Sequence, residues 1–124
     1  MIETNSSQRQ LRVASLIKLA LIEGLKKGKV KDLRLINNDV TITNVTISPD
    51  LRVATCYVVP FGIKKLSKAE LLDAFEVCKY DLRAFVTKNV ALKYSPELRF
   101  CYDKGFDNAN NVSALLENIS NNSN

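Results

Sequence analysis

The sequence predicts one α+β domain, and three features of its pattern support this class. The chain has 124 residues, of which 46% are hydrophobic, which is enough for a single buried core. Apolar residues recur at helical spacing in two long segments. Three other segments are rich in β-branched or aromatic residues, as strands usually are. We therefore expect a three-stranded sheet with helices on one face.

The first helix is expected over residues 8–27. Ser7 can cap its start, because a serine hydroxyl accepts a backbone N–H left free in the first turn. Gly28 stands where a left-handed C-terminal cap is needed. The segment 28–39 is expected to be a polar, basic connection. The apolar stripe of the helix consists of Val13, Leu16, Ile17, Ala20 and Leu21.

An antiparallel hairpin is expected next. Residues 40–48 are β-branched and alternate, but the alternation slips around Asn44, which predicts a bulge or a strong bend there. Pro49 suits the first central position of a turn over residues 48–50. Residues 51–59 form the returning strand, which residues 60–62 end.

The second helical segment begins after Ser67, another candidate cap. Its apolar stripe continues through residues 78–82, where a kink would give a pair of helices; one straight helix is the alternative. Residues 94–102 follow as the third strand, with Pro96 at its start. Residues 112–119 suit a short amphipathic C-terminal helix. The stripe of the second segment consists of Leu71, Phe75, Cys78, Leu82, Phe85 and Val86.

The resulting order, α-β-β-α-α-β with a short C-terminal helix, matches a KH-like type II domain, which is an RNA-binding class. We expect a flexible N-terminal tail over residues 1–6, the domain over 7–119, and a disordered C-terminal tail over 120–124. Because folds host many functions, this order alone argues weakly for RNA.

The composition argues against most catalytic chemistry. The chain has no histidine, so it lacks the commonest general base and zinc ligand. Its three cysteines, Cys56, Cys78 and Cys101, are far apart and form no C-x-x-C pair. No close acidic cluster suggests a metal pair. We expect no enzyme activity, cofactor, metal or small-molecule substrate, and a cytoplasmic location with no membrane segment.

Positive charge is concentrated near the N-terminus. The net charge is +5, and residues 8–34 carry eight cations against two acids, which suggests a polyanionic partner. A basic face that serves only solubility is an equal alternative on charge alone. The alternative for Arg12 and Arg34 is pairing with Glu97 or Asp32, and for Arg52 it is pairing with Asp50. The candidate RNA-binding residues are Arg9, Arg12, Lys26, Lys27, Lys29, Lys31, Arg34 and Arg52, with a second set at Lys79, Arg83 and Lys88.

Several segments resemble the ribosome-binding factor A family. They fall in the order and at the spacing of that family, and the resemblance covers roughly residues 7–119. The segments are QRQLRVA at 8–14, KDLRL at 31–35, VTISPDLRVA at 45–54 and SPELRF at 95–100, with Phe106 and Asp107 just beyond.

The resemblance implies a KH-like domain without the usual Gly-x-x-Gly loop, and no such motif lies between the expected middle helices here. The family places a kink at an Ala-x-Gly-like segment, which corresponds to residues 78–80. Tyr80 departs from that pattern, which puts in question how sharply the helix bends and how closely RNA approaches. Lys79 could add a phosphate contact there.

The resemblance also implies a function. Members of this family bind the free 30S small ribosomal subunit during late assembly, contact 16S rRNA near the decoding region, and assist processing of its 5′ end. We expect the same of this chain, acting as a monomer. The alternatives are a general KH-type RNA-binding protein acting on non-ribosomal RNA, a nuclease, and a protein-interaction adaptor.

Overall fold

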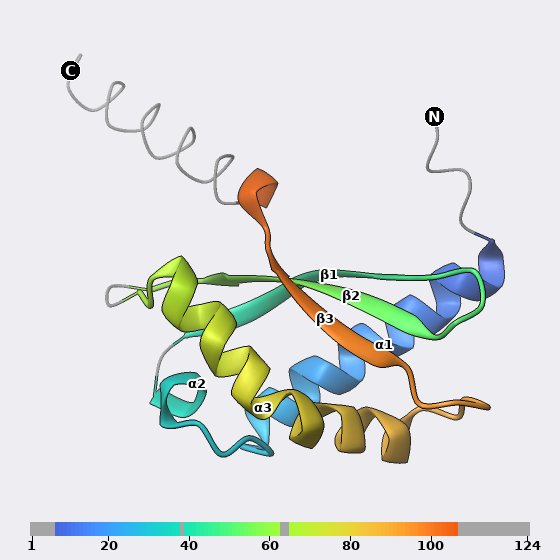
Figure 1. The fold of residues 1–124 in the computed structure, drawn as a ribbon, viewed down its shortest axis with the longest axis horizontal. Coiled ribbons are helices and arrows are strands. Elements are labelled where there is room, and N and C mark those ends of the chain that lie inside the picture. Colours follow the sequence, from blue (N-terminus) through green and yellow to red (C-terminus); the bar gives the residue numbers. More distant parts are fainter. Residues whose placement is uncertain (1–6, 38, 63–64, 107–124) are drawn as a thin grey trace, which may run out of the picture.

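The computed structural model describes residues 7–37, 39–62 and 65–106, and it confirms the α+β class (Figure 1). Three helices and a three-stranded sheet make up this part of the chain. The elements in chain order are α1 (Gln8–Lys26), α2 (Leu33–Asn37), β1 (Val40–Ile47), β2 (Val53–Pro60), α3 (Lys68–Asn89) and β3 (Glu97–Tyr102). The expected C-terminal helix and both expected tails lie outside the described residues.

Helix α1 begins with the predicted cap. The Ser7 hydroxyl accepts the backbone N–H of Gln10 at 3.1 Å, and the Gln10 side chain accepts the backbone N–H of Ser7 at 2.9 Å. The buried Gln10 amide also donates to the carbonyl of Ile47 at 3.0 Å, which ties the start of α1 to the end of β1. Gly28 adopts a φ of 67°, so the predicted left-handed turn after the helix is confirmed.

The sheet has the strand order β1-β2-β3, with β1 and β2 antiparallel and β2 and β3 parallel. The register shifts between Ile42 and Asn44, which confirms the predicted bulge. The Thr43 hydroxyl, at this bulge, donates to the carboxylate of Asp103 just after β3. The bulge therefore connects β1 to the C-terminal end of β3, the other edge strand of the sheet.

The turn between β1 and β2 covers residues 48–52, two residues more than the sequence suggested. The backbone N–H of Leu51 donates to the carbonyl of Ser48 at 2.8 Å, and Leu51 itself has a φ of 62°. A residue in this left-handed conformation cannot continue a strand. For that reason β2 begins at Val53 rather than at Leu51.

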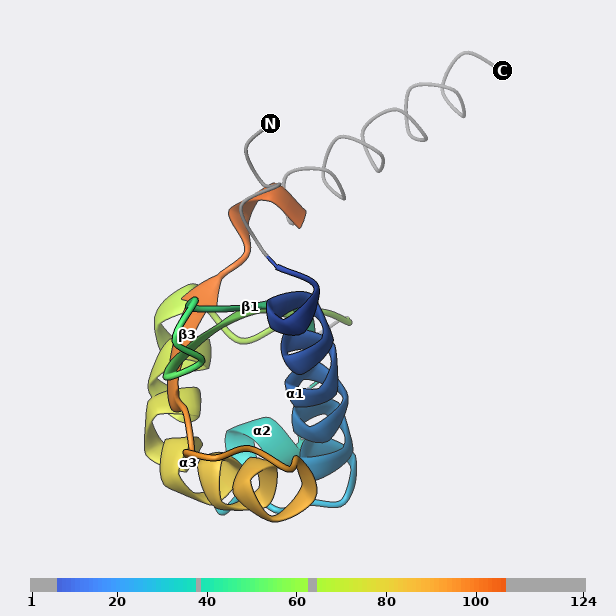
Figure 2. The same ribbon diagram turned by 90° about the vertical axis from the view of Figure 1, so that its right-hand side faces the viewer.

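Helix α3 is one continuous helix where a pair of helices was expected. Its axis bends partway along its length in both views (Figure 1, Figure 2). Ser67 caps its start as predicted, by accepting the backbone N–H of Glu70 at 3.1 Å. Residues 68–89 contain neither glycine nor proline to interrupt the helix, and the side chain of Tyr80 is 74% exposed.

The connection expected over residues 28–39 contains the short helix α2. Val30 and Leu35 are buried, so this segment closes one end of the core rather than running over the surface. The third strand is shorter than expected, because β3 begins at Glu97, directly after the buried Pro96.

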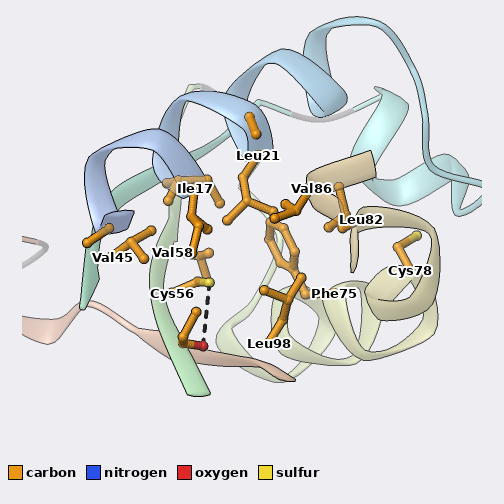
Figure 3. Packing of buried hydrophobic residues seen from close by; sticks show 14 of the residues in the cluster. Ile17, Leu21, Val45, Cys56, Val58, Phe75, Cys78, Leu82, Val86 and Leu98 are labelled. Carbon is orange, nitrogen blue, oxygen red and sulfur yellow. Dashed lines mark hydrogen bonds between the residues drawn. The ribbon is translucent and has the colours of Figure 1, made fainter. Parts of the chain in front are cut away.

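The helices α1 and α3 cover one face of the sheet, and the core lies between the two layers (Figure 2). The ring of Phe75 stacks on that of Phe100 with 4.7 Å between centroids, and Ile17 and Leu21 from α1 complete the centre of the core (Figure 3). All the helices in the described ranges are too short or too polar to cross a membrane.

The three cysteines are free, but they differ in environment. Cys56 and Cys78 are buried in the core, where they pack as small apolar residues (Figure 3). Burial raises the pKa of the Cys56 thiol to about 12. Cys101, by contrast, is exposed.

Candidate RNA-binding surface

Four lysines surround the C-terminal end of α1. Lys26 and Lys27 end the helix, and Lys29 and Lys31 follow the left-handed turn at Gly28. All four are exposed. Lys27 forms an ion pair with Glu23, one helical turn earlier, with 3.5 Å between Nζ and the carboxylate. Lys26, Lys29 and Lys31 take part in no ion pair within the described residues.

The fold brings Lys88, at the end of α3, to the same place. Lys29 and Lys88 line one shallow hollow together with Phe85. The close approach of the two helices explains this, since a Cβ atom built on Gly24 of α1 would lie 3.2 Å from the ring of Phe85. Lys88 is thus placed beside Lys29 and extends the group of lysines after α1, although it is far from them in sequence. We call the extended group the basic surface, and it consists of Lys26, Lys27, Lys29, Lys31 and Lys88.

Asp81 also lines this hollow and is the acidic group that opposes its lysines. A single carboxylate beside Lys29 and Lys88 leaves the hollow positive in balance. Asp81 would also repel a phosphate placed next to it, so the geometry favours a backbone that runs over Lys29 and Lys88 and away from Asp81.

Arg34, a candidate RNA contact, takes part in a structural network of ion pairs. Its Nη2 atom lies 2.6 Å from Asp32 and 2.9 Å from Asp73, so it connects α2 to α3. Hydrogen bonds from Arg34 hold the pKa of Asp32 below its usual value, and the same bonds raise the pKa of Arg34. The pairing of Arg34 with Asp32, one alternative in the sequence, is therefore confirmed.

Two members of the second candidate set also have protein partners. Arg83 donates to the hydroxyl and the carbonyl of Ser95 at 3.1 and 3.0 Å, which anchors the chain entering β3. The Nζ of Lys79 lies 3.0 Å from Glu76. Of this set, the structure leaves Lys88 as the cation of the basic surface, and the contribution of Lys79 and Arg83 to RNA contacts stays a prediction.

The remaining candidates lie at the other end of α1. Arg9 and Arg12 are exposed, and Arg12 does not pair with Glu97, which lies 3.0 Å from Arg99 instead. The guanidinium of Arg52 lies over the ring of Tyr94, with 4.8 Å from Cζ to the centroid. The backbone N–H of Arg52, rather than its side chain, contacts Asp50.

Two residues here were missed in the sequence. Lys93 and Tyr94 lie in the connection between α3 and β3, and Tyr94 is 52% exposed. Lys93 and Arg9 line the same cleft as the tyrosine ring. The adjacency of Lys93 and Tyr94 in the sequence could have identified them, since a cation beside an exposed aromatic ring is typical of sites that bind single-stranded RNA.

The described residues contain no group of three or more acidic or cysteine side chains that could hold a metal ion. Lys18, the remaining cation of α1, donates to the carbonyl of Thr43 at 3.1 Å and so fixes the bulge of β1. It therefore belongs to the scaffold.

The element order and the mixed three-stranded sheet with helices on one face place the chain in the KH-like class, and the lysine-rich surface suits the RNA-binding members of that class. The model of one family, ribosome-binding factor A, matches residues 9–116. The chain belongs to the ribosome-binding factor A family.

Individual relatives agree with this assignment. The chain is 46% identical over 114 residues to ribosome-binding factor A of Rickettsia felis, covering 92% of this chain and 94% of the relative. It is also similar to the solution structure of a putative ribosome-binding factor A from Thermotoga maritima, with a TM-score of 0.65 and 32% identity over 82% of this chain and 92% of the other.

A third relative is the Thermus thermophilus ribosome-binding factor A that was fitted into a cryo-electron microscopy map of a 30S complex. It shares the fold with a TM-score of 0.57 at 24% identity, over 73% of this chain and 91% of the other.

Proposed function

We propose that the chain binds the free 30S ribosomal subunit during its late maturation and contacts 16S rRNA near the decoding region through the basic surface. By this contact it assists processing of the 5′ end of 16S rRNA. The convergence of Lys29 and Lys88 on one hollow is the observation that carries the proposal. Family membership, and the 30S complex formed by the Thermus thermophilus relative, support the small subunit as the partner.

Phosphate neutralisation supplies the affinity. Each lysine that approaches a phosphate displaces condensed counterions, so binding weakens steeply as salt concentration rises. Such contacts fix orientation and carry little sequence information. Because the lysines of the basic surface come from the end of α1, the following turn and the end of α3, the surface suits a folded RNA backbone rather than one extended strand.

The proposed role involves no chemistry at a bound substrate. The chain has no histidine, the side chain that most often acts as a general base. Its family is one of ribosome-binding factors. We propose that it acts as a cytoplasmic monomer without a cofactor, and that nucleases perform the cleavage it assists.

Replacement of Lys26, Lys27, Lys29 and Lys31 together by alanine tests this proposal. The variant should bind purified 30S subunits more weakly, and the slope of log affinity against log salt should become shallower by about 0.7–0.9 for each phosphate that is no longer neutralised. Gradient sedimentation of cell extracts, with binding titrations at several salt concentrations, measures both effects.

Lys65, Lys68 and Lys104 are exposed outside the basic surface, so their triple alanine variant is the matched control. The control should bind like the unmodified protein. An unchanged affinity and slope in the quadruple variant would contradict the assignment of the surface. If the unmodified protein sedimented with RNA that is not part of a ribosomal subunit, the result would favour the alternative function of a general RNA-binding protein.

A further inference from the structure

A small cleft lies at the N-terminal end of α1, at the opposite end of that helix from the basic surface. Its walls come from the start of α1, the β1–β2 turn and the connection between α3 and β3, and Figure 2 looks onto this end of the molecule. The cleft has a volume of about 250 Å³. Clefts that enclose whole drug-sized ligands measure about 300–1,000 Å³, so this one suits a single ring system.

The lining of the cleft combines an apolar wall with two cations. Leu51 and Leu92 line it beside the ring of Tyr94, and Arg9 and Lys93 supply positive charge. Leu51 has a φ of 62°, and its backbone N–H donates to the carbonyl of Ser48 at 2.8 Å in the β1–β2 turn. We call this site the Tyr94 cleft.

Two cations contact the exposed ring of Tyr94. The Arg52 guanidinium carbon lies 4.8 Å from the ring centroid, and the Lys93 Nζ lies 5.4 Å from it. A cation over a half-exposed ring gains only a weak interaction, whereas a base stacked on an aromatic ring gains more. A base can therefore displace these cations from the ring, which leaves Lys93 free to contact its phosphate.

Asp50 is the acidic group of the cleft. Its carboxylate accepts the Ser48 hydroxyl at 2.6 Å and the backbone N–H of Arg52 at 3.1 Å. These bonds lower the pKa of Asp50. An aspartate is already ionised at neutral pH at its usual pKa, so Asp50 carries a negative charge. A phosphate therefore has to lie on the side of Arg9 and Lys93, away from the β1–β2 turn.

We propose that the Tyr94 cleft binds one unpaired nucleotide of an RNA strand, with its base stacked on Tyr94 and its phosphate beside Arg9 and Lys93. A base inside a duplex is stacked on its neighbours and cannot enter such a cleft, so the ligand is single-stranded. This inference rests on the proposed function, because the strand would belong to the rRNA of the bound subunit.

Tryptophan fluorescence gives a direct test, because the chain contains no tryptophan. The Tyr94→Trp variant carries one tryptophan in the cleft, and a stacked base should quench it. The probe is a single-stranded RNA hexamer, compared with the same hexamer made abasic. The intact hexamer should quench the variant and should bind about tenfold more tightly than the abasic one.

Phe61→Trp is the matched control, because Phe61 is also a partly exposed aromatic residue (46%) but follows β2, away from the β1–β2 turn. It should show little quenching by either hexamer. Equal binding of the intact and abasic hexamers to Tyr94→Trp, or equal quenching of the two variants, would overturn the cleft assignment.

Binding of 30S subunits to the unmodified protein separates this inference from the function on which it rests. Subunit binding without quenching by the hexamer overturns the cleft alone and leaves the proposed function intact. Quenching by the hexamer without subunit binding overturns the proposed function while the cleft still takes a base. Tyr94→Leu should weaken subunit binding and leave the salt slope unchanged, and an unchanged affinity would also count against the cleft.

Discussion

The two ends of α1 carry positive charge in different ways. At the C-terminal end, the lysines of the basic surface stand in solvent with few partners, and the surface is shallow. At the N-terminal end, Arg9 and Lys93 flank a cleft with an apolar wall and an aromatic ring. The first arrangement neutralises phosphates over a wide area, whereas the second has the shape to select a single ring.

The two ends therefore make different contributions to RNA binding, which the net charge of the chain does not distinguish. Binding through exposed lysines depends on salt and is tolerant of sequence, whereas stacking on an aromatic ring depends little on salt. One end of the helix would thus supply attraction to RNA and the other would require an unpaired base. The following variants test this division, from the largest expected effect to the smallest.

Gly24→Leu should have the largest effect, because it separates α1 from α3 without removing a charge. The new side chain meets the ring of Phe85, and overpacking of this kind costs about 1–3 kcal/mol of unfolding free energy. Urea unfolding should show this decrease, and 30S binding should weaken because Lys29 and Lys88 no longer share one hollow.

Gly24→Ala is the control for that variant. A methyl group requires Phe85 to move only slightly, and alanine favours the helix, so its stability should stay close to that of the unmodified protein. Full 30S binding by a Gly24→Leu protein that is destabilised would show that the two helices need not meet for function.

Lys29→Ala and Lys88→Ala should each weaken 30S binding by roughly three- to tenfold, which is the size expected when one phosphate is no longer neutralised. Because both side chains line one hollow, the double variant should be weakened by less than the product of the two single effects. A double-mutant cycle in binding titrations measures this coupling. Strict additivity would mean that the two lysines contact separate phosphates.

Asp32→Asn tests whether Arg34 belongs to the scaffold. The folded state lowers the pKa of Asp32 below its usual 3.8, so its carboxylate stabilises the protein above that pH and loses this effect as pH falls through the folded pKa. The variant should be less stable than the unmodified protein at pH 6, and the difference should shrink below about pH 4. Urea unfolding at pH 6 and pH 3 measures it, and a constant difference would contradict this role.

Lys27→Ala should have the smallest effect on the fold. Its pair with Glu23 joins two exposed side chains one turn apart, and such pairs stabilise helices by less than about 0.5 kcal/mol. Thermal unfolding should barely change. A large decrease in stability would mean that Lys27 has a structural role, which would reduce the basic surface by one cation.

Much of the fold was predictable because its signals are local. The caps at Ser7 and Ser67, the turn at Gly28 and the bulge near Asn44 each follow from the hydrogen-bonding or backbone preferences of a few neighbouring residues. Helix α2 was missed because five residues carry too little periodicity. The expected division of α3 did not occur because residues 68–89 contain neither glycine nor proline, which are the usual causes of a helix break.

The candidate site was less predictable, because a sequence does not show which cations have partners. Arg34 and Lys29 both lie in the same basic segment, yet Arg34 is held between two carboxylates and Lys29 stands in solvent. The Tyr94 cleft was missed because its walls come from three segments that are far apart in the chain.

The sequence by itself determined the α+β class, the caps and turns, the absence of histidine chemistry and the family. Those properties depend on residue types and on short-range spacing. Only the tertiary structure decided that Lys88 joins the lysines after α1, that Arg34 and Arg83 hold the scaffold, and that Arg9 meets Lys93 and Tyr94. The physical reason is that charge pairing and cleft shape depend on distances across the fold, and packing of α1 against α3 and the sheet sets those distances.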